Sequence, residues 1–148
     1  MGFKKILIAV DNSIYSEKAA KIGYQMAAKF EAVVALTNII VPVPITVNPE
    51  MTLAPAFMDV YENNEKNSMA LLKAFEKKYA KGIATVQVNS INSPVDGIIE
   101  EAKKWNADLI VIGTHGRTGL NHFFMGSVAE HVTRQSACPV LIVPNKEV

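Results

Sequence analysis

Three glycines and a serine in the stretch Val111–Val132, VIGTHGRTGLNHFFMGSVAEHV, have a spacing that could bind phosphate. Gly113 and Gly116 form G-x-x-G, and Gly126 and Ser127 follow after a further nine residues. Glycine lets the backbone approach a ligand closely. The first N–H groups of a helix are unpaired, and its dipole favours an anion there. A strand end, a glycine loop and a helix start would together suit a phosphate chain.

The same stretch also has a purely structural interpretation. SVAE matches a capping box, with Ser127 as the N-cap residue and Glu130 at the third helical position. The stretch matches neither the Walker A loop nor the dinucleotide fingerprint G-x-G-x-x-G. Spacing alone therefore leaves two alternatives open, a phosphate site or a plain turn followed by a capped helix.

The elements that would position this stretch follow from hydrophobic periodicity. Continuous apolar runs predict strands buried on both faces. One helix is predicted by the apolar stripe Ala19, Ile22, Gly23, Met26, Ala27 and Phe30. Another should begin at Ser93 as N-cap, with Pro94 first and Asp96 third, and should bury Val95, Ile98, Ile99, Ala102 and Trp105. The predicted strands span 6–10, 32–41, 83–90, 107–113 and 138–144, and the predicted helices span 12–30, 57–79, 94–105 and 127–136.

A proline-rich segment, residues 42–56, separates the second strand from the second helix. It contains four prolines and no helical period, which predicts a long loop that could act as a mobile lid. The helix after it should place Met58, Tyr61, Leu72, Phe75 and Tyr79 on its apolar side. Its middle, ENNEKN, should be solvated, and Gly82 should follow its end.

Alternating strands and helices predict one α/β domain over residues 1–148. We expect an open five-stranded parallel sheet in the order 3-2-1-4-5, with helices on both faces. Ligands bind such sheets at the carboxyl ends of strands where the winding direction reverses. In this order the ends AVDNS and IGTHG come from neighbouring strands beside that point.

Composition excludes several classes of protein. The net charge is +1, with 15 basic and 14 acidic residues and no basic patch, which argues against nucleic acid as the partner. Cys138 is the sole cysteine, so a disulfide within the chain is impossible. No run approaches the ~18 apolar residues of a membrane span, and the apolar start is too short for a signal peptide. We therefore expect a cytoplasmic protein without membrane insertion.

The chain resembles the universal stress protein family over nearly its whole length. The resemblance rests on KKILIAVDNSIYSEKA, ADLIVIGTHGRTGL and MGSVAEHVTRQSACPVLIVP. The pattern G-2x-G-9x-G-[S/T] is similar to the ATP-binding signature of that family, which the branch resembling universal stress protein A lacks. The resemblance implies a Rossmann-like fold of the adenine nucleotide α-hydrolase type and a stress-response or signalling module that binds ATP.

The resemblance also implies roles for individual residues. Asp11 would contact the ribose or adenine, and Arg117 could add charge near the phosphates. Backbone near the base would come from Ala9, Val10 and Ile39, and backbone beneath the ribose from Ile112 and Gly113. The phosphates would be held by Gly116, Gly126, Ser127, Val128 and Ala129. Some family members have a proline near Ala9 and a hydroxyl near Ala129, and this sequence has neither.

Other polar residues leave the functional alternatives open. His115 could meet phosphate or act as a base, or it could be an ordinary loop histidine. The scattered histidines and Cys138 have no metal-ligand spacing, so any Mg²⁺ or Mn²⁺ would bind through the phosphates. A passive ATP-binding module is the first hypothesis, since no Walker lysine or water-positioning residue is evident. The alternatives are a slow ATPase or phosphotransferase using His115 or Asp11, and a dimeric scaffold that binds no nucleotide.

The last predicted strand, Cys138–Pro144, suggests a partner. It should be an apolar sheet edge, and unpaired edges favour association. The edge and the family resemblance together predict a homodimer through this strand.

Overall fold

Five parallel strands form one sheet in the order β3-β2-β1-β4-β5, as the sequence predicts. The computed structural model describes residues 2–44, 54–115 and 125–146. The strands are β1 Lys5–Ala9, β2 Val33–Ile40, β3 Thr85–Ile91, β4 Leu109–Gly113 and β5 Val140–Val143.

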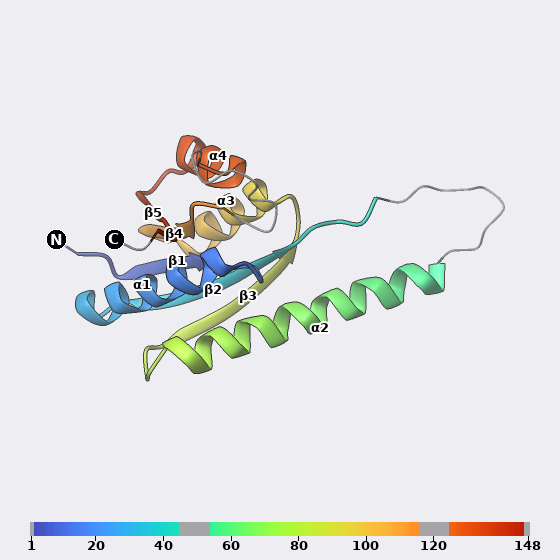
Figure 1. Ribbon diagram of the computed structural model, residues 1–148, viewed down its shortest axis with the longest axis horizontal. Coiled ribbons are helices and arrows are strands. Elements are labelled where there is room, and N and C mark those ends of the chain that lie inside the picture. Colours follow the sequence, from blue (N-terminus) through green and yellow to red (C-terminus); the bar gives the residue numbers. More distant parts are fainter. Residues whose placement is uncertain (1, 45–53, 116–124, 147–148) are drawn as a thin grey trace.

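Helices cover both faces of the sheet, two on each (Figure 1). One face carries α1 (Ile14–Phe30) and α2 (Ala54–Tyr79), and the other carries α3 (Pro94–Trp105) and α4 (Ser127–Gln135). Side chains of a strand alternate between faces. In β1, Ile6 and Ile8 belong to the core under α1 and α2, whereas Leu7 and Ala9 belong to the core under α3 and α4. Burial on both faces explains why this strand is apolar throughout.

Helices α1 and α3 bury the residues that their periodicity predicts. The α1 stripe lies against the sheet, and Ala20 and Tyr24 are buried beside it. The predicted face of α3 packs on the opposite side of the sheet. Ser93 caps α3 as expected, because its Oγ accepts a hydrogen bond from the Asp96 N–H at 3.3 Å.

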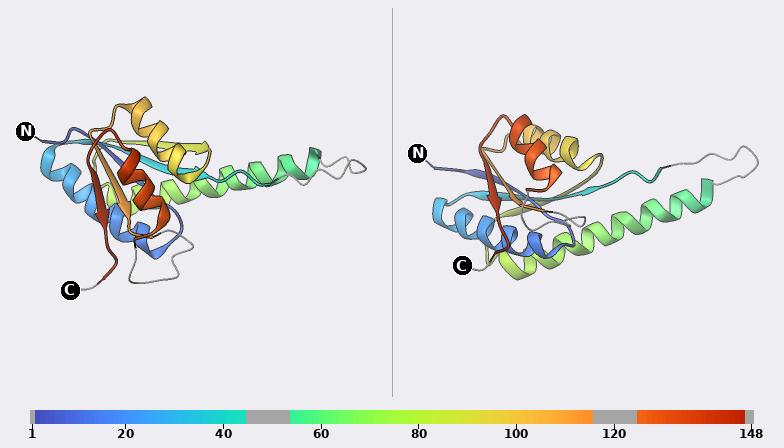
Figure 2. Two further views of the ribbon diagram at one scale, coloured as in Figure 1. Left: turned by 90° about the horizontal axis from the view of Figure 1, so that it is seen from above. Right: turned by 45° about the horizontal axis from the view of Figure 1, so that its top comes forward.

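Helix α2 begins earlier than predicted and extends past the sheet (Figures 1 and 2). It starts at Ala54, since a proline such as Pro55 is tolerated in a first helical turn. Its 26 residues span about 39 Å, whereas the eight residues of β2 span only about 26 Å. The predicted burial of Met58 is therefore wrong: this side chain is 62% exposed, because the sheet does not reach it.

The remaining predictions for this region have mixed outcomes. Leu72 and Phe75 are buried, and Tyr61 and Tyr79 are half-buried, as the apolar side of α2 predicts. The ENNEKN segment is largely exposed, also as predicted. Of the predicted loop 42–56, residues 54–56 are helical, and residues 45–53 lie outside the described part of the chain.

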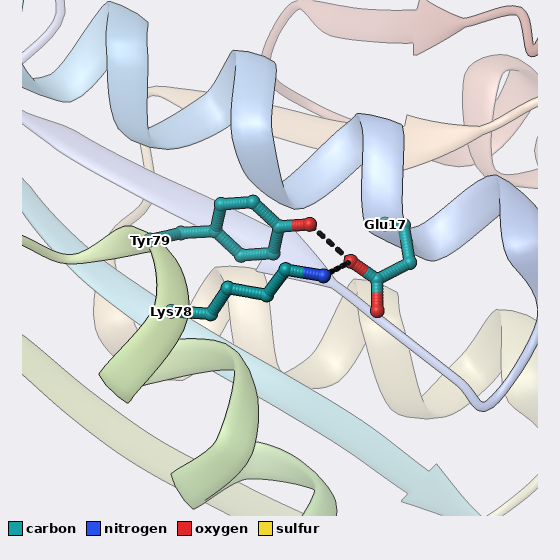
Figure 3. Close-up of polar contacts among 3 residues, drawn as sticks. All are labelled: Glu17, Lys78 and Tyr79. Carbon is teal, nitrogen blue, oxygen red and sulfur yellow. Dashed lines mark hydrogen bonds and ion pairs between the residues drawn. The ribbon is translucent and has the colours of Figure 1, made fainter.

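The C-terminal end of α2 is joined to α1 by a small polar cluster (Figure 3). The Tyr79 hydroxyl donates a hydrogen bond to Glu17, and the Lys78 ammonium lies 2.9 Å from the same carboxylate oxygen. The hydrogen bond from Tyr79 is the largest cause of a lowered pKa at Glu17, which partial burial opposes and Lys78 assists. The cluster fixes the first turn of α1 against the last turn of α2.

Within the described residues, no helix is both long and apolar enough to cross a membrane. The sheet edges are β3 and β5, as predicted.

Candidate functional site

The winding direction of the sheet reverses between β1 and β4, which are paired through Ile8 and Val111. From β1 the chain adds β2 and β3 on one side, and it then crosses to add β4 and β5 on the other. The carboxyl ends of β1 and β4 are the expected ligand position in such a sheet. Three segments meet there: the loop after β1, the end of β4, and the beginning of α4.

The loop after β1 is organised by the Asp11 side chain. Its Oδ1 accepts hydrogen bonds from the Ser13 N–H at 2.8 Å and the Ser16 Oγ at 2.9 Å. The Ser16 hydroxyl oxygen in turn accepts one from the Asp11 N–H at 2.7 Å. One carboxylate oxygen thus holds the turn, and no hydrogen bond to Oδ2 is recorded within the described chain. Asp11 can therefore position the loop and still offer an acceptor.

Asn38 supports this loop from β2, a role that the sequence analysis missed. It is buried, and its Nδ2 donates a hydrogen bond to the Val10 carbonyl at 2.8 Å. The Val10 N–H donates to the Thr37 carbonyl at 2.9 Å. A signal for Asn38 was available, because a polar residue inside an apolar strand needs a hydrogen-bonding partner.

The end of β4 is closed by Tyr15, a second residue that the analysis missed. A Cβ added to Gly113 would lie 2.8 Å from the Tyr15 Cβ and 3.0 Å from its carbonyl oxygen. Because two of the nearest atoms are backbone, α1 approaches β4 this closely only at a glycine. Periodicity does not predict this contact between distant segments.

Helix α4 begins one residue earlier than the capping-box interpretation requires. Its N-cap residue is Gly126, so the prediction of Ser127 as the cap is wrong. The Gly126 N–H donates to the Thr114 carbonyl at 2.7 Å, and a Cβ on Gly126 would lie 2.8 Å from that same oxygen. This contact fixes Gly126 outside the helix and makes Ser127 the first helical residue.

The first turn of α4 consequently has no side-chain cap among the described residues. The first bond within the helix runs from the Glu130 N–H to the Gly126 carbonyl at 3.0 Å. The N–H groups of residues 127–129 therefore have no acceptor within the helix. Glu130 instead pairs with Arg134 at 3.0 Å, one turn further along.

His115 lies between the starts of α1 and α4. Its ring is 5.0 Å from the Tyr15 ring, centroid to centroid, and its Cδ2 is 3.7 Å from the position of a Cβ on Gly126. His115 Nδ1 is 3.1 Å from the Thr114 Oγ1. Its Nε2 is buried and has no hydrogen-bond partner in the described structure. The Ser13 Oγ is likewise buried and has no partner there. Both atoms are buried polar groups at the ligand edge of the sheet.

Most of the predicted site residues converge on this edge. The side chains of Ala9, Val10, Ile112 and Ala129 are buried, so only their backbone could contact a ligand. Ile39 and Val128 are half-buried, and Ser127 is exposed. Gly116 and Arg117 lie outside the described residues.

No three His, Cys, Asp or Glu side chains gather as metal ligands within the described ranges. Cys138 is half-buried, and its sulfur lies 3.5 Å from the Ser136 hydroxyl. The arrangement at the edge is therefore mostly backbone donors with few acids, a chemistry suited to an anion.

The strand order 3-2-1-4-5, with the carboxyl ends of β1 and β4 side by side at the switch point, defines an α/β nucleotide-binding fold. Residues 2–144 match the model of the universal stress protein family, and the chain belongs to that family. Universal stress protein MJ0531 of Methanocaldococcus jannaschii is 33% identical over 147 residues, which cover 98% of this chain and 85% of the relative.

Solved structures of similar proteins cover the whole fold. The hypothetical protein MJ0577 aligns over 100% of both chains with a TM-score of 0.82 and 25% identity. A universal stress protein in complex with cAMP aligns over 97% of this chain and 98% of its own, with a TM-score of 0.63 and 24% identity. One from Archaeoglobus fulgidus in complex with dAMP aligns over 96% and 98%, with a TM-score of 0.61 and 18% identity.

Proposed function

We propose that this protein is a regulatory module that binds ATP at the carboxyl ends of β1 and β4. The observation that carries the proposal is the start of α4, where Gly126 replaces a side-chain cap and leaves the N–H groups of residues 127–129 without an acceptor in the helix. Such a helix end attracts phosphate through its donors and its dipole.

The neighbouring residues fit the rest of an adenine nucleotide. Asp11 can accept a hydrogen bond from a ribose hydroxyl, since its Oδ1 is the oxygen used in the turn. Gly113 and the backbone of Ala9, Val10, Ile39 and Ile112 would line the nucleoside end. Gly116 and Arg117 would extend the phosphate end. Family members of the same fold form complexes with cAMP and dAMP, which supports an adenine nucleotide as the ligand class.

Any Mg²⁺ or Mn²⁺ would accompany the nucleotide through its phosphate oxygens. The described residues offer no cluster of three His, Cys, Asp or Glu side chains, and in this proposal the ion is held by the phosphates. A bound ion would reduce the charge of the phosphates at the helix end.

Calorimetric titration with ATP, ADP, AMP and cAMP tests the proposal, together with identification of any nucleotide released by denaturing the purified protein. We expect saturable ATP binding with one site per chain. An absence of binding for all four nucleotides, with no nucleotide released, would favour the scaffold alternative and refute the module.

A turnover assay at high protein concentration distinguishes the catalytic alternative from the passive ATP-binding module. A passive module should hydrolyse ATP far more slowly than the ordinary enzyme range of about 1–10³ per second. Turnover within that range would favour a hydrolase or phosphotransferase that uses His115 or Asp11.

We also propose a homodimer through the edge strand β5. Its Val140, Leu141 and Ile142 are only half-buried, and one edge of the strand is unpaired in the described sheet. An apolar strand edge of this kind favours pairing with a second copy. Sedimentation at micromolar concentration, with and without ATP, should give a dimer; a monomer in both conditions would contradict it.

A further inference from the structure

The His115 imidazole is held in place by protein contacts on three sides. The Tyr15 ring packs against it, Thr114 Oγ1 is 3.1 Å from its Nδ1, and its Cδ2 edge faces Gly126 at the start of α4. Nε2 is covalently bonded to Cδ2, so this nitrogen is on the ring edge nearest α4. It is the one ring nitrogen for which the described structure provides no partner.

A buried ring nitrogen without a partner is unfavourable, because it loses its hydrogen bonds to water. The chemistry of the missing partner depends on the ring tautomer, which the contact of 3.1 Å between Nδ1 and the Thr114 Oγ1 leaves open. If the Thr114 hydroxyl donates to Nδ1, the ring proton is on Nε2, and Nε2 needs an acceptor. The neighbouring N–H groups of α4 are also donors that need an acceptor. With the ring proton on Nε2, an anionic oxygen is the group that satisfies both.

We propose that His115 Nε2 donates a hydrogen bond to a phosphate group bound at the start of α4. The inference rests on the proposed nucleotide site and adds a side chain to a set of ligands that is otherwise mostly backbone. Tyr15 and Thr114 act as positioning residues, since they contact the ring and not the phosphate. His115 then contributes to the affinity for the phosphates and not to that for the nucleoside.

Three substitutions of His115 separate the roles of its two nitrogens. His115→Phe keeps a ring beside Tyr15 and removes both nitrogens. His115→Asn keeps a polar group near the Nδ1 position, and His115→Gln keeps an N–H donor near the Nε2 position. We expect the Phe and Asn variants to lose about 10- to 100-fold in ATP affinity, the usual effect of losing a hydrogen bond to a charged group. The Gln variant should keep most of the affinity.

Adenosine provides the matched ligand, because it has no phosphate. Its affinity should be the same for the parent and all three variants in calorimetric titration. His131→Phe provides the matched control variant. His131 is an exposed residue of α4, and its Nδ1 is hydrogen-bonded to the Ser127 carbonyl oxygen at 2.6 Å. This control should bind ATP like the parent. Equal losses for ATP and adenosine, or no loss of ATP affinity in His115→Phe, would overturn the proposal.

A measurement on the parent protein keeps the test independent of whether the variants fold. With ¹⁵N-labelled histidine, ATP should shift the Nε2 resonance of His115 while adenosine leaves it in place. ATP that binds without moving this resonance refutes the role of His115 and leaves the nucleotide site intact. A parent that binds no nucleotide at all refutes the proposed function itself, so the two failures are distinguishable.

Discussion

Helices α3 and α4 pack against each other on one face of the sheet, but their first residues differ. At α3, Ser93 Oγ accepts from the Asp96 N–H and donates to the Asp96 carboxylate at 2.8 Å. The Ser93 side chain thus satisfies one N–H of this end, and Asp96 already places a negative charge there. At α4, a glycine occupies the N-cap position, and no side chain of the described residues caps the helix.

The difference teaches that two similar sequence motifs can build opposite environments. Ser93-x-x-Asp96 and Ser127-x-x-Glu130 both match a capping pattern. Only the first forms the cap. Gly126, which is bonded to the Thr114 carbonyl, is the N-cap residue of α4, and Glu130 pairs with Arg134. A helix start without a cap, beside the switch point of the sheet, is suited to an anionic ligand, whereas the start of α3 is not.

The largest expected effect comes from a negative charge at the start of α4. Ser127→Asp should remain as stable as the parent, because an acid in the first helical turn is favourable. With phosphates at this end, one charge pair at about 4 Å and an effective dielectric near 20 costs on the order of 4 kcal/mol. ATP affinity should therefore fall roughly a thousandfold, less whatever a bound metal ion screens. Calorimetric titration beside a thermal melt measures both quantities.

Ser93→Asp is the matched control for this charge. Aspartate is as good an N-cap residue as serine, so α3 should retain its stability. Its ATP affinity should equal that of the parent, because no phosphate is proposed there. Near-parental affinity in a folded Ser127→Asp protein would mean that the phosphates bind elsewhere.

A methyl group at the start of α4 should have the next largest effect. In Gly126→Ala the new Cβ would lie 2.8 Å from the Thr114 oxygen and 3.2 Å from the His115 Cα. Both are backbone atoms, so they cannot rotate away as a flexible side chain could. We expect a loss of about 1–3 kcal/mol in the free energy of unfolding, which urea denaturation measures. An unchanged midpoint would show that the loop yields easily and that Gly126 is not required for packing.

Removal of the two serine hydroxyls tests the assignment of the caps directly. Ser93→Ala should lower the free energy of unfolding by about 1 kcal/mol, since it removes an N-cap hydrogen bond. Ser127→Ala should leave it nearly unchanged, because Ser127 is the first helical residue and caps nothing. Equal losses in parallel urea titrations would restore the capping-box interpretation and argue against an uncapped α4.

The sequence predicts the sheet well because burial on both faces leaves a continuous apolar run, as in Ile6–Val10. The strand order and the α3 cap follow from similar local rules. Contacts between distant segments do not. The contacts of Tyr15 with Gly113 and of Asn38 with Val10 join residues that hydrophobic periodicity does not relate. A third such contact, Gly126 with Thr114, accompanies Gly126 and not Ser127 as the N-cap residue of α4. The prediction for Met58 is wrong for the same reason, because the apolar stripe of a helix does not reveal where the sheet beneath it ends.

Helix α1 extends the comparison to a third first turn, with the smallest expected effect. The acidic residue of its first turn, Glu17, contacts Tyr79 and Lys78 of α2 (Figure 3). The pKa of Glu17 is lowered in the folded state, chiefly by the Tyr79 hydroxyl. The resulting stability is therefore present above the ordinary pKa of the carboxyl and is lost as pH falls through the folded value.

Because the side chain is 46% exposed, Glu17→Gln should cost only about 0.5 kcal/mol at pH 7. Urea titrations of parent and variant should converge at acidic pH, where the parent carboxyl is also neutral, and ATP affinity should not fall. A difference in stability that persists below the folded pKa would assign the effect to packing and not to the charge of Glu17.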